Sequence, residues 1–379
     1  MKAKITEFSH DLPLTDDFKS IVLNQNPLID VRAPVEFQQG AFEMSSNLPL
    51  MTDEERHKVG ICYKEHGNAT AVRLGHQLVN EQVRAPRVQA WQDFVQQHPD
   101  ALLYCFRGGQ RSKISQQWLA EQGVEITRLT GGYKAFRRYL IDYLDAVPVL
   151  MTEKAIQSVV VAGRTGCGKT LVINQLNNSI DLEGLAHHRG SAFGRHATPQ
   201  PTQINFENNL AMAMIRLFEK NPKQMVIEDE GRNIGSVNLP VELFDYLKND
   251  QRVLVETSIE ERVAITLDEY VVEAQQEYAV QNGSDNALQA WVDFMLAAFG
   301  RIQKRLGGER HQRVMKLFET AVSHQQQTGS VESHQAWIET LLTEYYDPMY
   351  DYQMQKHHRK VNFQGTQQEV IDYLQSQAQ

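Results

Sequence analysis

A glycine-rich turn between an apolar run and a helix-like segment constrains this 379-residue chain most strongly. The run SVVVAG (158–163) predicts a buried strand and leads directly into GRTGCGKT (163–170), which matches the pattern GxxxxGK[ST]. In that context the backbone amides fold around phosphate oxygens and the lysine adds a positive charge. The segment therefore predicts a phosphate-binding loop (P-loop) at the end of a strand in an α/β sheet.

The residue types of this loop predict separate roles. The expected phosphate-binding residues are Gly163, Gly166, Gly168, Lys169 and Thr170. Cys167 is expected to be a small filler rather than a nucleophile.

A P-loop usually works with Mg²⁺, held by its Ser or Thr hydroxyl and by an acid at the end of a neighbouring strand. The buried run MVIED (225–229) supplies such an acid, so the expected metal ligands are Thr170, Glu228 and Asp229 and the expected cofactor is Mg²⁺. The alternative for these successive carboxylates is a solvated strand end.

A second loop, CFRGGQRS (105–112), also follows an apolar run and precedes a helical pattern. Amides that point at the sulfur, together with nearby arginines, favour a thiolate or persulfide over a neutral thiol. Cys105 and Arg111 are therefore the expected catalytic residues, with Arg107, Gly108 and Gly109 around the bound selenium, sulfur or phosphate anion. Two alternatives stay open: a buried structural cysteine, and the Cys-x5-Arg spacing of cysteine phosphatases.

Alternating strand and helix patterns predict two α/β domains with parallel sheets. The first is expected over residues 1–147, with the junction near Pro148, and the P-loop core over 148–275. Beyond about Ala274 strand patterns vanish and long amphipathic helices follow, so residues 276–379 are expected to be a helical region packed on the P-loop domain.

The composition restricts the class of protein. A hydrophobic content of 41% predicts packed cores, and a net charge of −9 argues against coating nucleic acid through bulk positive charge. The chain has no apolar run of membrane-spanning length, and its start has no signal-peptide pattern, so the sequence favours the cytoplasm without membrane attachment. Three scattered cysteines predict neither a disulfide framework nor a zinc site.

Three segments resemble the signatures of a rhodanese domain: IDVRAPVEFQQGAF (29–42), the Cys105 loop, and LTGGYKAF (129–136). The P-loop follows them, with HRGSAFG (188–194), INFEN (204–208), IEDEGRNIG (227–235) and KRLGG (304–308). In this order the chain resembles the bacterial tRNA 2-selenouridine synthase family over nearly its whole length. The resemblance implies a rhodanese-like domain followed by a P-loop NTPase-like domain with a helical C-terminal extension.

The resemblance also implies a reaction at the wobble uridine (position 34) of tRNAs that read lysine, glutamate and glutamine codons. Geranyl diphosphate first alkylates the 2-thio group, and selenophosphate then supplies selenium while the geranyl thiol leaves. By this likeness Cys105 would handle selenium as a transient selenylsulfide, and the P-loop residues would cradle the diphosphate. Which loop takes which donor stays open, and an enzyme that supplies selenophosphate is among the partners that the resemblance allows.

Because the chain is acidic, tRNA binding would depend on local basic clusters. Two clusters lie in RIQKRLGGERHQRVMK (301–316) and QKHHRK (355–360), and their candidate contacts are Arg301, Lys304, Arg305, His357, His358, Arg359 and Lys360.

The segment YYDPMYDY (345–352) would either stack an unpaired base or pack at a helix end. His188, Arg189, Arg195 and His196 flank HRGSAFG, which is either a ligand-covering loop or a solvated one, and Arg262 either reaches phosphate or lies on a helix surface.

Three rival functions remain compatible with these motifs. The first is a P-loop kinase or NTPase with a regulatory rhodanese domain. The second is a phosphatase-like enzyme that uses Cys105 and Arg111. The third is a tRNA-binding scaffold without catalysis.

Overall fold

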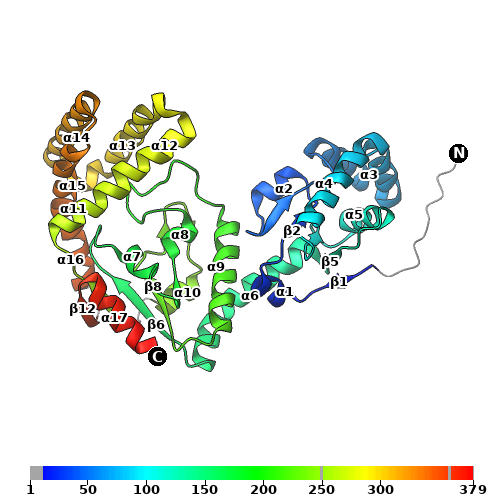
Figure 1. Cartoon of the computed structure of the whole chain (residues 1–379), viewed down its shortest axis with the longest axis horizontal. Helices are drawn as coiled ribbons and strands as arrows, with labels where there is room; N and C mark the ends of the chain where they lie inside the picture. The colour runs from blue at the N-terminus through cyan, green and yellow to red at the C-terminus, as the bar shows by residue number, and fades with distance from the viewer. Residues whose placement is uncertain (1–11, 248–250, 357–359, 379) are drawn as a thin grey trace. The chain divides into compact units, whose positions relative to one another are not determined.

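The computed structural model describes residues 12–247, 251–356 and 360–378, and the chain divides into two compact units. Unit 1 contains the chain up to Tyr143 together with Glu207–Arg216, and unit 2 contains Leu144–Phe206 and the chain from Leu217 onward. Figure 1 shows the elements of each unit. The expected junction at Pro148 lies inside helix α6 (Gly132–Glu153), so a continuous helix and not a loop runs through this point.

Unit 1 is built on a five-stranded parallel sheet in the order β1-β5-β4-β2-β3. Its strands are short: β1 (Leu14–Thr15), β2 (Leu28–Asp30), β3 (Ser45–Asn47), β4 (Leu102–Tyr104) and β5 (Thr127–Leu129). The predicted strands at 27–31 and 101–105 are β2 and β4, and they pair with each other in parallel. The expectation of a parallel sheet in this part of the chain is confirmed.

The helices of unit 1 are α1 (Phe18–Asn24), α2 (Pro34–Gln39), α3 (Asp53–Leu78), α4 (Glu81–Gln97), α5 (Gln110–Glu121) and α6. Trp91 of α4 and Trp118 of α5 pack in the core with the apolar side chains of β2 and β4. Helix α3 is interrupted at Gly67, whose φ of 77° and ψ of 178° lie in a backbone region that essentially only glycine adopts. Two helical halves therefore meet at an angle at this residue.

Unit 2 contains a second five-stranded parallel sheet, in the order β12-β11-β6-β8-β7. Its strands are β6 (Gln157–Ala162), β7 (Ser179–Ile180), β8 (Gln224–Glu228), β11 (Gln251–Val255) and β12 (Val361–Gly365). A separate antiparallel pair joins β9 (Asn233–Ile234) to β10 (Val237–Asn238). The other helices of this unit before the helical layer, and the last helix of the chain, are α7 (Lys169–Ile173), α8 (Leu182–Ala186), α10 (Val241–Leu247), α11 (Ile259–Leu267) and α17 (Gln367–Ala378). Helix α9 (Gln203–Glu219) is divided, because its residues 207–216 belong to unit 1.

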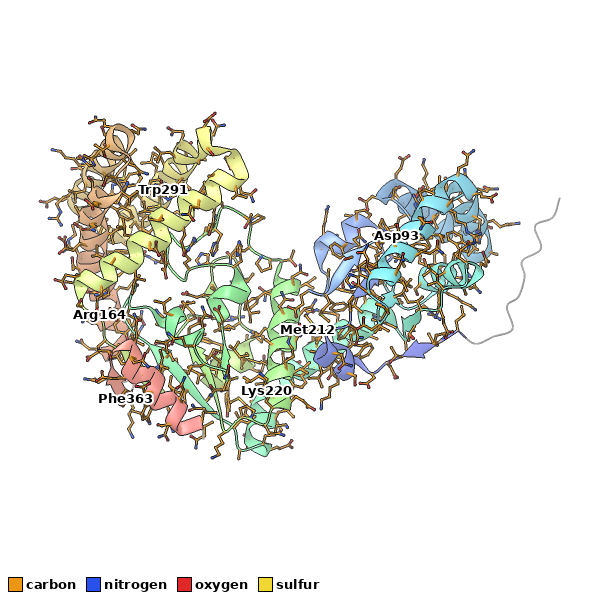
Figure 2. The ribbon with its side chains drawn as sticks, viewed as in Figure 1. Asp93, Arg164, Met212, Lys220, Trp291 and Phe363 are labelled. Carbon is orange, nitrogen blue, oxygen red and sulfur yellow. The ribbon has the colours of Figure 1, made fainter. Side chains whose placement is uncertain are left out.

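A helical layer follows α11 and has its own apolar core. It contains the π-helix η1 (Asp268–Glu273), α12 (Ala274–Asn282), α13 (Ser284–Leu306), α14 (Gly308–Thr328), η2 (Glu332–His334), α15 (Gln335–Leu341), the π-helix η3 (Leu342–Tyr346) and α16 (Asp347–Lys356). Trp291, Phe299, Phe318 and Trp337 pack against one another at its centre; Figure 2 labels Trp291. The predicted amphipathic helices are present here.

The expectation that the chain beyond Ala274 holds only helices is wrong at β12. This strand adds to the edge of the P-loop sheet beside β11, and α17 packs against α7 and β11. The strand is short and its burial alternates, with Val361 and Phe363 half-buried between exposed polar residues. Such a brief alternation resembles a polar loop in a sequence, because an edge strand has only one covered side.

Within the described part of the chain, no helix combines the length and the apolar character needed to cross a membrane.

Candidate active site

Cys105 lies at the end of β4, directly before a loop that leads into α5. The residue is 3% exposed, and its Sγ lies 3.0 Å from the hydroxyl oxygen of Ser112. Phe106 and Arg107, by contrast, are exposed. The sulfur therefore lies at the base of the loop, and the loop residues that follow it face solvent.

The loop is held in place by the third rhodanese-like segment. The amides of Tyr133 and Lys134 donate to the carbonyls of Cys105 and Phe106, each at 2.9 Å. A Cβ atom on Gly132 would lie 2.2 Å from the Cys105 carbonyl oxygen, and one on Gly108 would lie 2.8 Å from the Gly131 nitrogen. Glycine is required on both sides because the two backbones touch directly.

The sequence predicted that Arg111 would face the Cys105 sulfur. In the structure its guanidinium is instead paired with an acidic side chain. Its guanidinium donates to both carboxylate oxygens of Glu36, at 2.5 and 3.1 Å, and Arg56 pairs with the same carboxylate at 2.9 Å. Burial alone would raise the pKa of Glu36, but the hydrogen bonds and charge of Arg111 lower it below its usual value. Glu36 is therefore an anion that positions Arg111.

The sequence did not single out Arg128, which is the arginine bonded to the Cys105 loop. Its guanidinium donates to the carbonyl of Gly108 and, at 3.1 Å, to the side chain of Gln116. Burial lowers the pKa of Arg128, and the nearby sulfur of Cys105 acts in the opposite direction. No motif spacing connects residue 128 with residue 105; parallel pairing of β4 with β5 brings them together.

The P-loop of unit 2 follows β6. At its glycine positions any side chain would collide with neighbouring atoms. A Cβ on Gly163 would lie 2.4 Å from the Cys167 Sγ, and one on Gly166 would lie 2.5 Å from the Thr266 hydroxyl. Gly166 and Gly168 also have φ values of 77° and 80°, which L-residues rarely adopt. Cys167 is 1% exposed, which agrees with its expected filling role, and burial raises the pKa of its thiol.

Thr170 and Lys169 begin helix α7 and face acidic side chains. The Thr170 hydroxyl donates to Glu183 at 3.0 Å. Burial alone would lower the pKa of Lys169, but Cys167 and the carboxylates of Glu183 and Glu230 raise it. Lys169 therefore stays a cation in this setting.

The two carboxylates expected to hold a metal have different surroundings. Glu228, 3% exposed, accepts a hydrogen bond from the Leu182 amide at 2.7 Å, while its other oxygen has no hydrogen-bond partner. Burial, with the charges of Asp181 and Glu183, raises the pKa of Glu228 well above its usual value. Asp229 lies 3.8 Å from Arg252. Among the residues that the structure describes, no three His, Cys, Asp or Glu side chains are placed to hold a metal by themselves.

Three further acidic residues lie around Lys169: Glu230, which belongs to the acidic run considered for the metal, and Glu183 and Glu269, which the sequence did not single out. Burial and the charge of Glu183 raise the pKa of Glu230 well above its usual value, and the same two causes raise the pKa of Glu269 to about 7. A Cβ on Gly190 would lie 2.0 Å from a Glu183 oxygen, so the HRGSAFG segment passes directly over this carboxylate. Glu183 and Glu269 lie on the short helices α8 and η1 and follow no recognisable spacing, so only the fold brings them to the P-loop.

Arg262 is 3% exposed and does not lie on a helix surface. Its Nε donates to the Thr165 carbonyl of the P-loop at 3.0 Å, and its two terminal nitrogens donate to Asp347 at 3.0 and 2.7 Å. Arg164, labelled in Figure 2, donates to Asp351 on the same helix α16 at 2.8 Å. Helix α16 therefore holds the P-loop from outside.

The YYDPMYDY segment has both buried and exposed aromatic side chains. Tyr345 and Tyr346 are each 8% exposed and belong to the core of the helical layer, which supports packing over base stacking for these two, whereas Tyr352 is 60% exposed. Pro348 lies in the first turn of α16 and does not end a helix.

The basic residues expected to contact tRNA are only partly described. Lys304 and Arg305 are exposed on α13, and Lys360 is exposed before β12. Arg301 donates to the Ala192 carbonyl of the HRGSAFG segment at 3.0 Å, and burial together with the positive charge of Arg195 lowers its pKa. His357, His358 and Arg359 lie outside the described residues.

Of the four residues singled out around the HRGSAFG segment, Arg195 is exposed, whereas Arg189, His196 and His188 are held by contacts or buried. Arg189 and His196 both contact Glu277, at 2.5 and 2.8 Å. His188 is 5% exposed, and burial with the charges of Arg195 and His196 lowers its pKa to about 4.

Comparisons with known proteins agree with this arrangement. Residues 14–139 match the model of the rhodanese-like domain, and residues 156–379 match that of the tRNA 2-selenouridine synthase AAA domain. The chain is 58% identical to a tRNA 2-selenouridine synthase of Hydrogenovibrio crunogenus, with 97% of this chain and 100% of that protein covered. Proteins of the same name from Sulfurovum sp. and Marinobacter nauticus are 52% and 46% identical, each with 96% of this chain and 98% of the relative covered. With a rhodanese-like unit, a P-loop unit and relatives matched along nearly their whole length, the chain belongs to the tRNA 2-selenouridine synthase family of enzymes.

Proposed function

We propose that this enzyme converts 2-thiouridine at the wobble position of tRNA into 2-selenouridine, with geranyl diphosphate and selenophosphate as co-substrates. The observation that carries the proposal is the presence in one chain of two anion-binding loops, one built on Lys169 and the other on Cys105. Each loop follows a parallel strand, where open α/β sheets bind ligands. The relatives described above carry the name of this product.

The first step is assigned to the P-loop. Its amides and Lys169 would hold the diphosphate of geranyl diphosphate while the 2-thio sulfur attacks the first carbon of the geranyl chain. A sulfur–carbon bond forms, the carbon–oxygen bond to diphosphate breaks, and the uridine N3 proton is released. The product is a thioether whose C2 carbon has a better leaving group than before.

Mg²⁺ fits the chemistry of the P-loop side chains. The Thr170 hydroxyl and the unpartnered oxygen of Glu228 are hard oxygen ligands of the kind that Mg²⁺ prefers, and both have Glu183 as a neighbour. When bound, the ion would neutralise charge on the departing diphosphate. Lys169 and the loop amides would then orient that group. Asp229, beside Arg252, would be a further candidate ligand.

The second step is assigned to the Cys105 loop, which would hold selenophosphate. A transient selenylsulfide on Cys105 would need an oxidant, because selenium in selenophosphate is already at the selenide level. In a balanced route the Cys105 sulfur instead attacks phosphorus, so that a sulfur–phosphorus bond forms and the phosphorus–selenium bond breaks. The released hydrogen selenide anion attacks C2, the carbon–sulfur bond breaks, geranyl thiolate leaves, and a proton passes from selenium to N3. Water then hydrolyses the phosphocysteine to phosphate, and no external oxidant or reductant is needed.

The tRNA is expected to contact exposed basic side chains, of which Lys304 and Arg305 on α13 and Lys360 before β12 are described. An enzyme that delivers selenophosphate is a candidate partner. Work on tRNA would place the reaction in the cytoplasm.

The deciding experiment incubates the full chain with 2-thiouridine tRNA, geranyl diphosphate and selenophosphate, and identifies the digested nucleosides by mass spectrometry. We expect S-geranyl-2-thiouridine without selenophosphate and 2-selenouridine with it. If neither nucleoside forms and the protein instead hydrolyses or transfers phosphate from ATP, the proposal fails in favour of a kinase or NTPase.

The phosphatase alternative is less compatible with the structure. A phosphate-gripping arginine must face the anion above the cysteine. Arg111 instead forms two hydrogen bonds with Glu36. Cys105-dependent hydrolysis of a simple phosphoester in the absence of tRNA would reverse this preference.

A further inference from the structure

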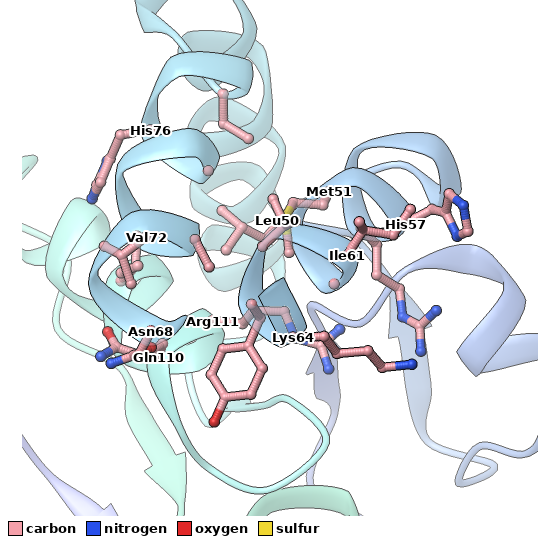
Figure 3. A pocket seen from close by; sticks show the side chains of 18 of the residues that line it. Leu50, Met51, His57, Ile61, Lys64, Asn68, Val72, His76, Gln110 and Arg111 are labelled. Atoms are coloured by element: carbon pink, nitrogen blue, oxygen red, sulfur yellow. The ribbon is translucent and has the colours of Figure 1, made fainter. Parts of the chain in front are cut away.

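Unit 1 contains a cavity of about 590 Å³ that none of the roles above uses. It lies between the two halves of α3 and the start of α5, and Figure 3 shows the side chains that line it. Ligand cavities in proteins typically measure about 300–1,000 Å³, so this one is large enough for a small organic group.

The lining is mostly apolar and is reachable from outside. Its apolar side chains are Leu50, Met51, Val59, Ile61, Ala71, Val72, Val79, Ile114 and Trp118. Ile61 and Tyr63 are 43% and 58% exposed, which is high for large apolar side chains on one surface. Exposed apolar surface around a cavity is typical of binding sites.

The cavity adjoins the Cys105 loop. Gln110 and Arg111, which follow that loop at the start of α5, also line the cavity. In Figure 3 they lie on the same side of the cavity as Lys64 and Asn68. Cys105 packs in the same apolar cluster as the lining residues Leu50 and Trp118. A group attached to a nucleoside at the loop would thus have an apolar cavity beside it.

The shape of the cavity depends on the interruption of α3. Some of the residues between 56 and 64 line it from the first half of the helix, and some of those between 68 and 79 line it from the second half and its end. Gly67 separates the halves with a backbone conformation that excludes other residues. Two glycines, Gly60 and Gly75, lie on the lining itself, and neither has a backbone atom near the position of a Cβ.

We propose that this cavity holds the geranyl chain of the S-geranyl-2-thiouridine intermediate while selenium is delivered from the Cys105 loop. The inference rests on the proposed function and deepens it, since it assigns the apolar part of one substrate to named residues. An isoprenoid chain of about ten carbons is wholly apolar and is stabilised mainly by removal of its surface from water. The polar nucleoside would then lie toward Gln110 and Arg111. This arrangement selects the alkylated base over plain 2-thiouridine, because only the alkylated base fills the cavity.

The cavity can be filled without a change in any charged residue. Gly75→Leu places a side chain in it from the second half of α3, where the nearest atom to a Cβ is 4.0 Å away on the Val59 side chain. Gly60→Leu does the same from the first half. Both changes favour a helix, because leucine is a better helix former than glycine. Ala69→Leu is the matched control, since Ala69 is exposed on the same helix and does not line the cavity.

The test uses the full chain with binding and activity measured separately. Calorimetry compares the nucleosides S-geranyl-2-thiouridine and S-methyl-2-thiouridine. We expect the wild type and Ala69→Leu to prefer the geranyl nucleoside at least tenfold, and Gly75→Leu and Gly60→Leu to lose that preference. In activity assays the two filled variants should lose at least tenfold in kcat/KM for selenation of pre-geranylated tRNA and keep geranylation of 2-thiouridine tRNA.

The outcomes separate this inference from the proposed function. If the filled variants bind the geranyl nucleoside as the wild type does, or lose both reactions equally, the cavity assignment is overturned. If the wild type binds the geranyl nucleoside in a Gly75-dependent way but makes no selenouridine, the cavity assignment stands and the proposed function fails. Unchanged thermal unfolding of the variants establishes that each one is folded.

Discussion

Arg262 of α11 and Asp347 of α16 form a two-pronged ion pair, with nitrogen–oxygen distances of 3.0 and 2.7 Å. The third bond of the same guanidinium, from Nε, goes to the Thr165 carbonyl inside the P-loop. A side chain 97 positions away along the sequence thus fixes the conformation of a phosphate-binding loop. Arg262 is 3% exposed, so these hydrogen bonds take the place of water around its guanidinium.

Replacement of Asp347 by alanine should destabilise unit 2 strongly. Removal of one partner of a buried ion pair leaves an uncompensated charge and costs about 3–5 kcal/mol. Asp351→Ala, four residues further on, breaks a half-exposed pair with Arg164 and should cost less than about 1 kcal/mol. Urea unfolding followed by circular dichroism compares the two variants, and equal losses would contradict the bracing role of Arg262.

Replacement of Cys105 by serine should abolish selenium transfer and leave geranylation intact. Serine keeps the size of the side chain but is a far weaker nucleophile toward phosphorus. Nucleoside mass spectrometry should show S-geranyl-2-thiouridine accumulating without 2-selenouridine. Cys62→Ser, a change at a second buried cysteine on α3, is the control and should retain both activities. Full selenation by Cys105→Ser would remove Cys105 from the mechanism.

Gly132→Ala should distort the Cys105 loop, whereas Gly109→Ala should be tolerated. The new methyl group at residue 132 would lie 2.2 Å from a carbonyl oxygen, on a backbone with a φ of 59°, and we expect a loss of roughly 2–3 kcal/mol. At residue 109 no atom lies within 4 Å of the added methyl group, so the loss should be below about 1 kcal/mol. Thermal unfolding measures both, and the reverse order would mean that the two backbones do not touch.

Substitution of Thr170 should expose the requirement for Mg²⁺. Thr170→Val removes the hydroxyl that donates to Glu183, while Thr170→Ser keeps it. We expect the valine variant to need at least tenfold more Mg²⁺ for half-maximal geranylation and the serine variant to resemble the wild type. Identical Mg²⁺ titrations for both variants would exclude Thr170 as a ligand.

His334 should make the helical layer sensitive to mild acid. Its ring is fully buried, accepts a hydrogen bond from Trp337 at 2.9 Å and contacts Gln325 at 2.9 Å, and burial lowers its pKa to about 4. The unfolded chain therefore binds a proton near pH 6.5, well before the folded chain does. This contribution to stability is complete above pH 6.5 and is lost as pH falls toward 4, by roughly 3 kcal/mol. His334→Gln should reduce the dependence of the unfolding free energy on pH over this range. An unchanged slope of unfolding free energy against pH would contradict the assignment.

The two loops could be read from the sequence because their chemistry is local. GRTGCGKT and CFRGGQRS each combine strand, turn and helix signals within a dozen residues, and all of their glycines except Gly109 leave no space for a side chain. Ser258 and Glu261 form a capping box at the start of α11, a feature whose residues likewise lie within one helical turn.

The side chains that contact these two loops could not be predicted from the sequence, because long-range packing brings them to the loops. Pairing of the strands brings Arg128 to the Cys105 loop. The guanidinium of Arg111 forms its ion pair with Glu36 and not with the Cys105 sulfur. Glu183 and Glu269 reach Lys169 from separate helices. The cavity beside α5 likewise arises from a single glycine conformation that breaks an otherwise continuous helical pattern.

The position of β12 has a consequence for synthesis on the ribosome. Strand β11 pairs with β6 on one side and with β12 on the other, yet about a hundred residues of helical layer separate β11 from β12 in the chain. Until residues 361–365 leave the exit tunnel, one edge of β11 has no strand beside it, and an open edge can pair with another nascent chain. If the ribosome stalls while it translates the helical layer, the nascent chain exposes the unpaired edge of β11. We therefore expect protection of this edge by chaperones to be most important during this stretch of translation.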